Sequence, residues 1–103
     1  AVDPALHGSL SAQAMWLAGR LAKRRGDAGA AHESWTRGLQ TGHPDALLAS
    51  QLHLALAKLC EHQLGRLQEA LTHAAHSGLA EGDEASLHRR ARLERKRSAR
   101  SPV

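Results

Sequence analysis

The sequence predicts an all-helical protein, and its composition carries most of that prediction. The 103 residues include 20 Ala and 17 Leu, both of which favour helices. The β-branched residues are two Val and three Thr, and Tyr and Phe are absent. Because strands favour β-branched and aromatic side chains, a fold built on a sheet is strongly disfavoured. Apolar residues also recur every three or four positions, as in helices with one buried face, and the length suits one domain.

A first helical hairpin is expected near the amino end of the chain. Its first helix is expected to begin at Ser9 or Ser11 and to end just before Gly26. Gly26 suits the left-handed conformation that commonly follows a helix, and Asp27 suits the cap of the next helix. The second helix is then expected over residues 28–40.

A second hairpin is expected to follow, and its first helix is rich in leucine. Pro44 is expected at the first position of this helix, which covers residues 45–63, because the missing N–H costs nothing there. Leucines on more than one face predict that it is the most buried element. A fourth helix is expected over residues 67–77, ending in the glycine-terminated segment Ser77-Gly78-Leu79.

Positive charge is concentrated at the carboxyl end. Residues 1–87 hold seven Lys or Arg against nine Asp or Glu, whereas residues 88–103 hold seven Lys or Arg against one Glu. The net charge of +4 therefore arises from the last sixteen residues. A fifth helix is expected to begin near Asp83, with acidic residues in its first turn, and to fray from about Ser98.

The two hairpins are related by an internal repeat. Gly26 and Gly65 lie 39 residues apart, and so do Ala31 and Ala70. A single hairpin cannot bury its own apolar face, so repeated hairpins are expected to stack. The expected organisation is an extension over residues 1–8, two helix–turn–helix units over 9–81, and a basic helix and tail over 82–103.

The first unit resembles a tetratricopeptide repeat, and the second unit shares part of the pattern. The matching positions of the first unit are Gly19, Gly26-Asp27, Ala31, Trp35 and, about one residue beyond the expected place, Pro44. Those of the second unit are Ala57, Cys60, Gly65-Arg66-Leu67, Ala70 and Ala74, with one extra residue between Cys60 and Gly65. The resemblance implies a short right-handed solenoid of two hairpins, followed by the basic helix.

A narrower resemblance concerns residues 56–64, 69–71 and 88–96. They are similar to the carboxyl-terminal helical region of certain bacterial proteins that carry a ribonuclease-H-like, exonuclease-type domain. This chain lacks the paired carboxylates that such a domain needs for two-metal chemistry, so the resemblance places catalysis elsewhere. Since the chain begins with neither Met nor a signal pattern, we expect a fragment of a larger protein. One cysteine fits a reducing, cytoplasmic compartment, and no apolar run reaches membrane-spanning length.

The tetratricopeptide resemblance also implies a partner-binding face, formed by the first helix of each hairpin. A tryptophan beside several cations suits an acidic peptide, or another domain of the parent chain. The alternative is that Trp16 packs against a neighbouring helix and that the cations are ordinary solvated side chains. Carried over by position, the face comprises Gln13, Trp16, Arg20, Lys23, Arg24, Gln51, Leu54, Lys58 and Glu61.

A second function is open to the basic carboxyl-terminal helix, which could contact nucleic-acid phosphates without sequence preference. It has no aromatic residue for stacking on bases and no base-reading motif. The alternative is a terminal helix that covers the last repeat, and the two roles are compatible. The candidate residues are Arg89, Arg90, Arg92, Arg95, Lys96 and Arg97.

The sequence predicts no catalytic residue, cofactor or metal. Eight histidines are many for this length, and His73 and His76 could share a helix face, but HExxH and CxxC motifs are absent. Surface histidines explain the count, and Cys60 is expected to be a buried structural thiol. Because two repeats are fewer than stable solenoids usually need, we expect packing against a further domain or a homodimer.

Overall fold

The computed structural model describes the backbone of residues 4–100 and the side chains of residues 11–100. All the elements in this part of the chain are helical, which confirms the all-helical prediction. The outer ends of the expected extension and basic tail, residues 1–3 and 101–103, lie outside the described residues. None of the described helices is both long and apolar enough to cross a membrane. In order, the elements are α1 (Pro4–Arg24), α2 (Ala28–Thr41), α3 (Ala46–Leu59), the π-helical turn η1 (Cys60–Leu64), α4 (Leu67–Ala74), α5 (Gly78–Glu81) and α6 (Asp83–Arg100).

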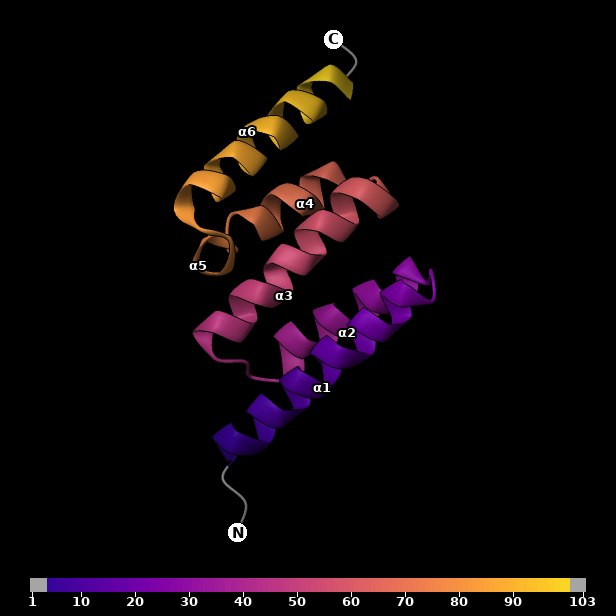
Figure 1. The fold of residues 1–103 in the computed structure, drawn as a ribbon, viewed down its shortest axis with the longest axis vertical. Coiled ribbons are helices and arrows are strands. Elements are labelled where there is room, and N and C mark those ends of the chain that lie inside the picture. The colour runs from indigo at the N-terminus through magenta and orange to yellow at the C-terminus, as the bar shows by residue number, and fades with distance from the viewer. Residues whose placement is uncertain (1–3, 101–103) are drawn as a thin grey trace.

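The helices are stacked in a row rather than gathered around one centre (Figure 1). α1 and α2 form an antiparallel hairpin, α3 packs on α2, α4 packs on α3, and α6 covers α4. The short helix α5 contacts α3. The radius of gyration is 14.5 Å, above the roughly 13 Å expected for a compact domain of this length. The stack accordingly has two buried apolar clusters, one at α1–α3 and one around α3, η1, α4 and α6.

The first half of the chain follows the expected helices, with two corrections. α1 begins at Pro4, ahead of the predicted Ser9 or Ser11, because proline is favoured at the first helical position. Asp27 caps α2 as predicted, its carboxylate accepting a hydrogen bond of 3.0 Å from the backbone N–H of Ala30. Pro44, however, is not the first residue of α3.

Asp45 takes the capping position of α3, which explains why Pro44 lies outside the helix. The Asp45 carboxylate accepts a hydrogen bond of 2.8 Å from the backbone N–H of Leu48. A side-chain acceptor satisfies one of the free N–H groups at a helix start, which a proline at the first position cannot do.

The second half departs further from the expected boundaries. The single helix predicted over 45–63 is divided, because α3 ends at Leu59 and the chain continues as the π-helical turn η1. The extra residue noted between Cys60 and Gly65 lies within this wider turn. The predicted glycine-terminated end at Ser77-Gly78-Leu79 is wrong, because α4 already ends at Ala74 and Gly78 begins α5. At the carboxyl end, α6 remains helical to Arg100 rather than fraying from Ser98.

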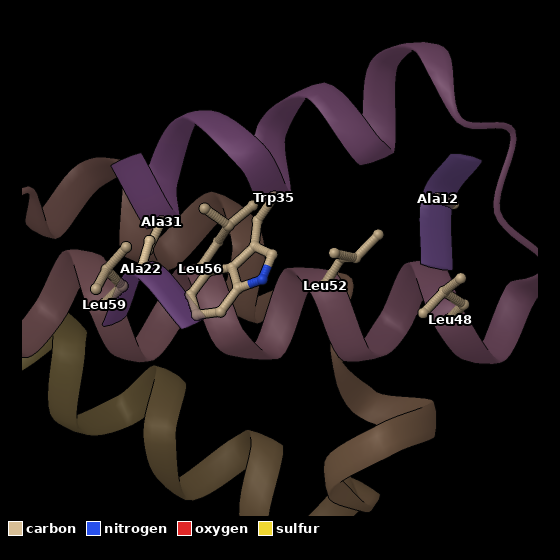
Figure 2. Close-up of a cluster of buried hydrophobic side chains, with 8 residues drawn as sticks. All are labelled: Ala12, Ala22, Ala31, Trp35, Leu48, Leu52, Leu56 and Leu59. Carbon is tan, nitrogen blue, oxygen red and sulfur yellow. The ribbon is translucent and has the colours of Figure 1, made fainter. Parts of the chain in front are cut away.

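Trp35 of α2 is the largest side chain in the first apolar cluster, and it is only 2 % exposed. Figure 2 shows its indole directed towards α3, beside Leu56. The indole Nε1 donates a hydrogen bond of 3.1 Å to the backbone carbonyl of Trp16. A Cβ atom at Gly19 of α1 would lie 2.1 Å from that Nε1 atom. α1 and α2 therefore approach closely because position 19 has no side chain.

A buried ion cluster joins α6 to η1. Glu61 is 6 % exposed, and Arg92 donates two hydrogen bonds of 3.0 and 2.8 Å to its carboxylate oxygens. Lys96 donates at 2.7 Å and Arg89 at 3.4 Å. The hydrogen bonds from Arg92 lower the pKa of Glu61 to about 2 against the opposing effect of burial, and Lys96 adds to the lowering. Glu61 therefore holds α6 to η1 by ion pairs, and Leu93 of α6 is fully buried in the second apolar cluster.

We expect Gly19→Ala to destabilise the protein by about 1–3 kcal/mol, because the added methyl group overlaps the Trp35 indole. The matched control is Gly29→Ala on α2, where the nearest side-chain atom to a new Cβ would be 3.8 Å away. There, the higher helix propensity of alanine should stabilise by up to about 1 kcal/mol. Urea unfolding of both variants measures the difference, and equal effects would contradict a close approach at Gly19.

We expect Glu61→Gln to lower the free energy of unfolding by about 2–4 kcal/mol, because three cations then face a buried neutral amide. The matched control is Glu94→Gln on α6, whose exposed carboxylate pairs with Arg97 at 2.7 Å. An exposed pair contributes little, so the control should change stability by less than about 1 kcal/mol. Guanidinium unfolding followed by circular dichroism tests both, and a Glu61 variant as stable as the control would exclude the anchoring role.

Candidate functional site

A groove of about 820 Å³ lies between α1, α3 and α5. Seven residues that the sequence predicted on the partner-binding face line it together, whereas Gln13 and Glu61 do not. Its lining contains four cations and no acidic residue. The full lining is Trp16, Arg20, Lys23, Arg24, Trp35, Leu47, Gln51, Leu54, Ala55, Lys58, Leu79 and Ala80.

The groove has a basic end and an apolar end. α1 and α3 run in the same direction, because each packs antiparallel to α2 (Figure 1). The cations lie towards the carboxyl ends of both helices, with Arg20, Lys23 and Arg24 on α1 and Lys58 on α3. All four are exposed.

The apolar end is formed where α5 meets the first half of α3. Leu47 of α3 is 51 % exposed and Leu79 of α5 is 67 % exposed, so both side chains are largely uncovered. The backbone N–H of Ala80 donates a hydrogen bond of 2.9 Å to the buried hydroxyl of Ser50, which holds α5 against α3. A ligand along the groove would therefore meet leucine side chains at one end and positive charge at the other.

Trp16 forms the wall of the groove between these ends. Its ring centroid lies 5.8 Å from that of Trp35, and the Arg20 guanidinium carbon lies 5.9 Å from the Trp16 centroid. The side chain is half-buried, so it both packs against α2 and faces the groove. The two sequence-based interpretations of Trp16 are therefore compatible. Arg20 beside the ring can make a cation–π contact and still present donors to a ligand.

Glu61, which the sequence placed on the same face, lies instead under α6. Its side chain is fully buried in the ion cluster, so it has no surface to offer a partner. Glu61 lies under α6 because the π-helical turn η1 changes its direction and because α6 packs over that turn. Neither feature follows from helical spacing within the second unit.

The unpaired basic surface of α6 is smaller than the sequence indicates, because several of its cations form ion pairs with acidic side chains. Among the six candidates for nucleic-acid contact, Arg89, Arg92 and Lys96 bind Glu61. Arg97 donates to Gln68 at 2.8 Å and to Glu94 at 2.7 Å. Arg90 and Arg95 are exposed.

A second polar cluster lies where α2, η1 and α4 meet, and sequence spacing gave no sign of it. His32 Nε2 contacts the Glu69 carboxylate, and the Cys60 thiol donates to Glu69 Oε2 at 3.4 Å. Burial, followed by the nearby Glu69 carboxylate, raises the pKa of Cys60 to about 12. Burial would raise the pKa of Glu69, but hydrogen bonds from His32 and Cys60 outweigh it, and the net shift is downward. Cys60 is thus buried as predicted. Its neighbours, however, are polar side chains of the kinds that bind metal ions.

Three histidines adjoin this cluster, one on α3, one on α4 and one in the turn that follows α4. His53 and His73 are joined through their Nδ1 atoms at 2.9 Å, and the His53 and His76 ring centroids lie 5.0 Å apart. Burial lowers the pKa of His53 to about 4, with further lowering by His73 and His76. Burial also lowers the pKa of His73, whose side chain is only 14 % exposed. His73 is therefore not the surface histidine that the sequence predicted.

Comparison with protein-family models, with curated proteins and with solved structures gives no match for this chain. The functional interpretation therefore depends on the groove, the basic helix and the polar cluster themselves.

Proposed function

We propose that this chain is a non-catalytic protein-interaction module whose groove binds an acidic segment of a partner protein. The observation that carries the proposal is the asymmetry of the groove, which has four cations at one end and uncovered leucines at the other. A segment with an apolar residue followed by acidic residues would match both ends. Desolvated contacts with leucine and tryptophan supply affinity, and the cations supply orientation.

The tetratricopeptide resemblance supports the same face. In the two-unit arrangement that we propose, α1 and α3 are the first helices of the units, and these two helices line the groove. The small residues that the resemblance matches lie at buried helix contacts, as shown by full burial of Ala31, Ala57 and Ala70. A cytoplasmic bacterial setting and a larger parent protein remain part of this proposal.

A nucleic-acid function of α6 has less support. Three of its six candidate cations are paired within the protein with the carboxylates of Glu61 and Glu81, so fewer unpaired charges remain for phosphates. The groove cations, by contrast, lie beside a tryptophan and apolar side chains, which suit a peptide better than a phosphate backbone.

Charge reversal in the groove provides the test. The probe is a synthetic peptide in which leucines precede a run of glutamates, titrated while tryptophan fluorescence is recorded, because Trp16 lies in the groove wall. We expect Arg20→Glu combined with Lys58→Glu to weaken binding by more than about tenfold, since attraction becomes repulsion at the basic end. The fold, followed by circular dichroism, should be unchanged because both side chains are exposed.

The matched control is Arg90→Glu combined with Arg95→Glu on α6, which changes the net charge by the same amount. This control should bind the peptide as the unmodified protein does. Equal weakening by both pairs would show unspecific charge attraction and reject the groove as the site. Tighter binding of an oligonucleotide than of the peptide, lost only in the α6 pair, would instead support the nucleic-acid function.

A further inference from the structure

We infer that His32, Cys60 and Glu69 form a binding site for one Zn²⁺ ion. Each residue contributes one ligand-type atom, and these atoms all lie within 4.8 Å of one another. Ligand atoms bound to a tetrahedral zinc ion are roughly 3–4 Å apart, because each lies about 2.0–2.3 Å from the metal. The separation of 3.4 Å between Cys60 Sγ and Glu69 Oε2 already fits this geometry.

The donor set favours zinc over other common ions. Thiolate, imidazole and carboxylate are the three side-chain groups that bind zinc in proteins, whereas Mg²⁺ and Ca²⁺ prefer oxygen ligands throughout. In the absence of a cation, the Cys60 thiol keeps its proton and donates a hydrogen bond to Glu69 Oε2. On binding, that proton passes to solvent and the thiolate binds the ion.

The elements that carry the three ligands hold them in place. His32 lies on α2, Cys60 is the first residue of η1, and Glu69 lies on α4. π-Helical turns occur frequently at functional sites, and here the turn buries two consecutive residues, with Cys60 near α4 and Glu61 under α6. Cys60 is fully buried, but the side chains of His32 and Glu69 are 20 % and 32 % exposed. An ion can therefore enter from solvent.

His73 acts as a positioning residue for the carboxylate ligand. Its Nε2 atom lies 3.6 Å from Glu69 Oε2, and its Nδ1 atom is held by His53. Residues that contact a metal-binding side chain without binding the metal themselves fix the orientation of that side chain and raise the affinity for the metal. With three protein ligands, the fourth tetrahedral position is left to a water molecule.

Zinc at this position would join the two hairpins directly. His32 belongs to the first hairpin, whereas Cys60 and Glu69 belong to the second. Two repeats bury little apolar surface, and a metal ion bound only by the folded chain would add stability. The site shares no residue with the groove, so this inference does not depend on the proposed peptide binding.

Cobalt substitution tests the site, since Co²⁺ bound to a thiolate has a charge-transfer absorption that histidine-only binding lacks. The reduced protein, carrying no histidine tag, is titrated with CoCl₂ and then with ZnCl₂ as competitor. We expect one equivalent of Co²⁺ to give the thiolate band and Zn²⁺ to abolish it. Cys60→Ser should remove the band, and His32→Ala should weaken Co²⁺ binding by at least about tenfold.

His73→Ala separates positioning from ligation. This variant should keep the thiolate band but weaken Co²⁺ binding by about 10–100-fold. The matched control is His88→Ala on α6, an exposed histidine outside the cluster, which should bind as the unmodified protein does.

Zn²⁺ should also raise the melting temperature of the unmodified protein and of His88→Ala, but not that of Cys60→Ser. If Cys60→Ser fails to fold, His32→Ala and Glu69→Gln replace it in the melting experiment, because both of these side chains are partly exposed. Co²⁺ binding without a thiolate band, a band that survives Cys60→Ser, or equal loss in His32→Ala and His88→Ala would overturn the inference and assign metal binding to surface histidines.

Discussion

The close approach of α1 and α2 around Trp35 is the constraint on which the rest of the structure depends. The indole occupies the space left by Gly19, and its N–H is bonded to the backbone of Trp16, so both its position and its direction are determined. Since the chain has no Tyr or Phe and much of its apolar content is Ala, water can be excluded only by close helix packing. Leu52 and Leu56 of α3 join the same cluster, which places α3 relative to α1 and so creates the groove.

Burial of Glu61 has a comparable effect at the other end of the stack. A carboxylate under α6 requires cations around it, because an unpaired buried charge is costly. Arg92 and Lys96 supply them, and the highly basic helix is thereby attached to the body of the protein. Part of the positive charge that first indicates an external polyanion is therefore balanced within the molecule. The cations that remain beside an apolar surface are those of the groove, and this contrast favours a peptide ligand.

The groove proposed for peptide binding and the proposed zinc site lie in different parts of the molecule. The groove is formed by α1, α3 and α5 together with Trp35 of α2, whereas the zinc ligands come from α2, η1 and α4. α3 packs against α2 of the first hairpin and against α4 of its own hairpin, and so connects the two sites. An ion that fixes α2 relative to α4 would also limit movement of α1 and α3, which are packed on α2, and would thus support the shape of the groove.

The tetratricopeptide resemblance, carried over by position, named seven of the side chains that line the groove. The sequence by itself determined the helical class and the cap at Asp27. Each of these depends on propensity, or on neighbours within a turn or two of the same helix. Only the tertiary structure decided that Glu61 lies under α6 rather than in the groove, and that His32, Cys60 and Glu69 meet. The two long-range results arise because α6 and α2 bring distant residues to the η1 turn, whose register ordinary helical spacing does not predict.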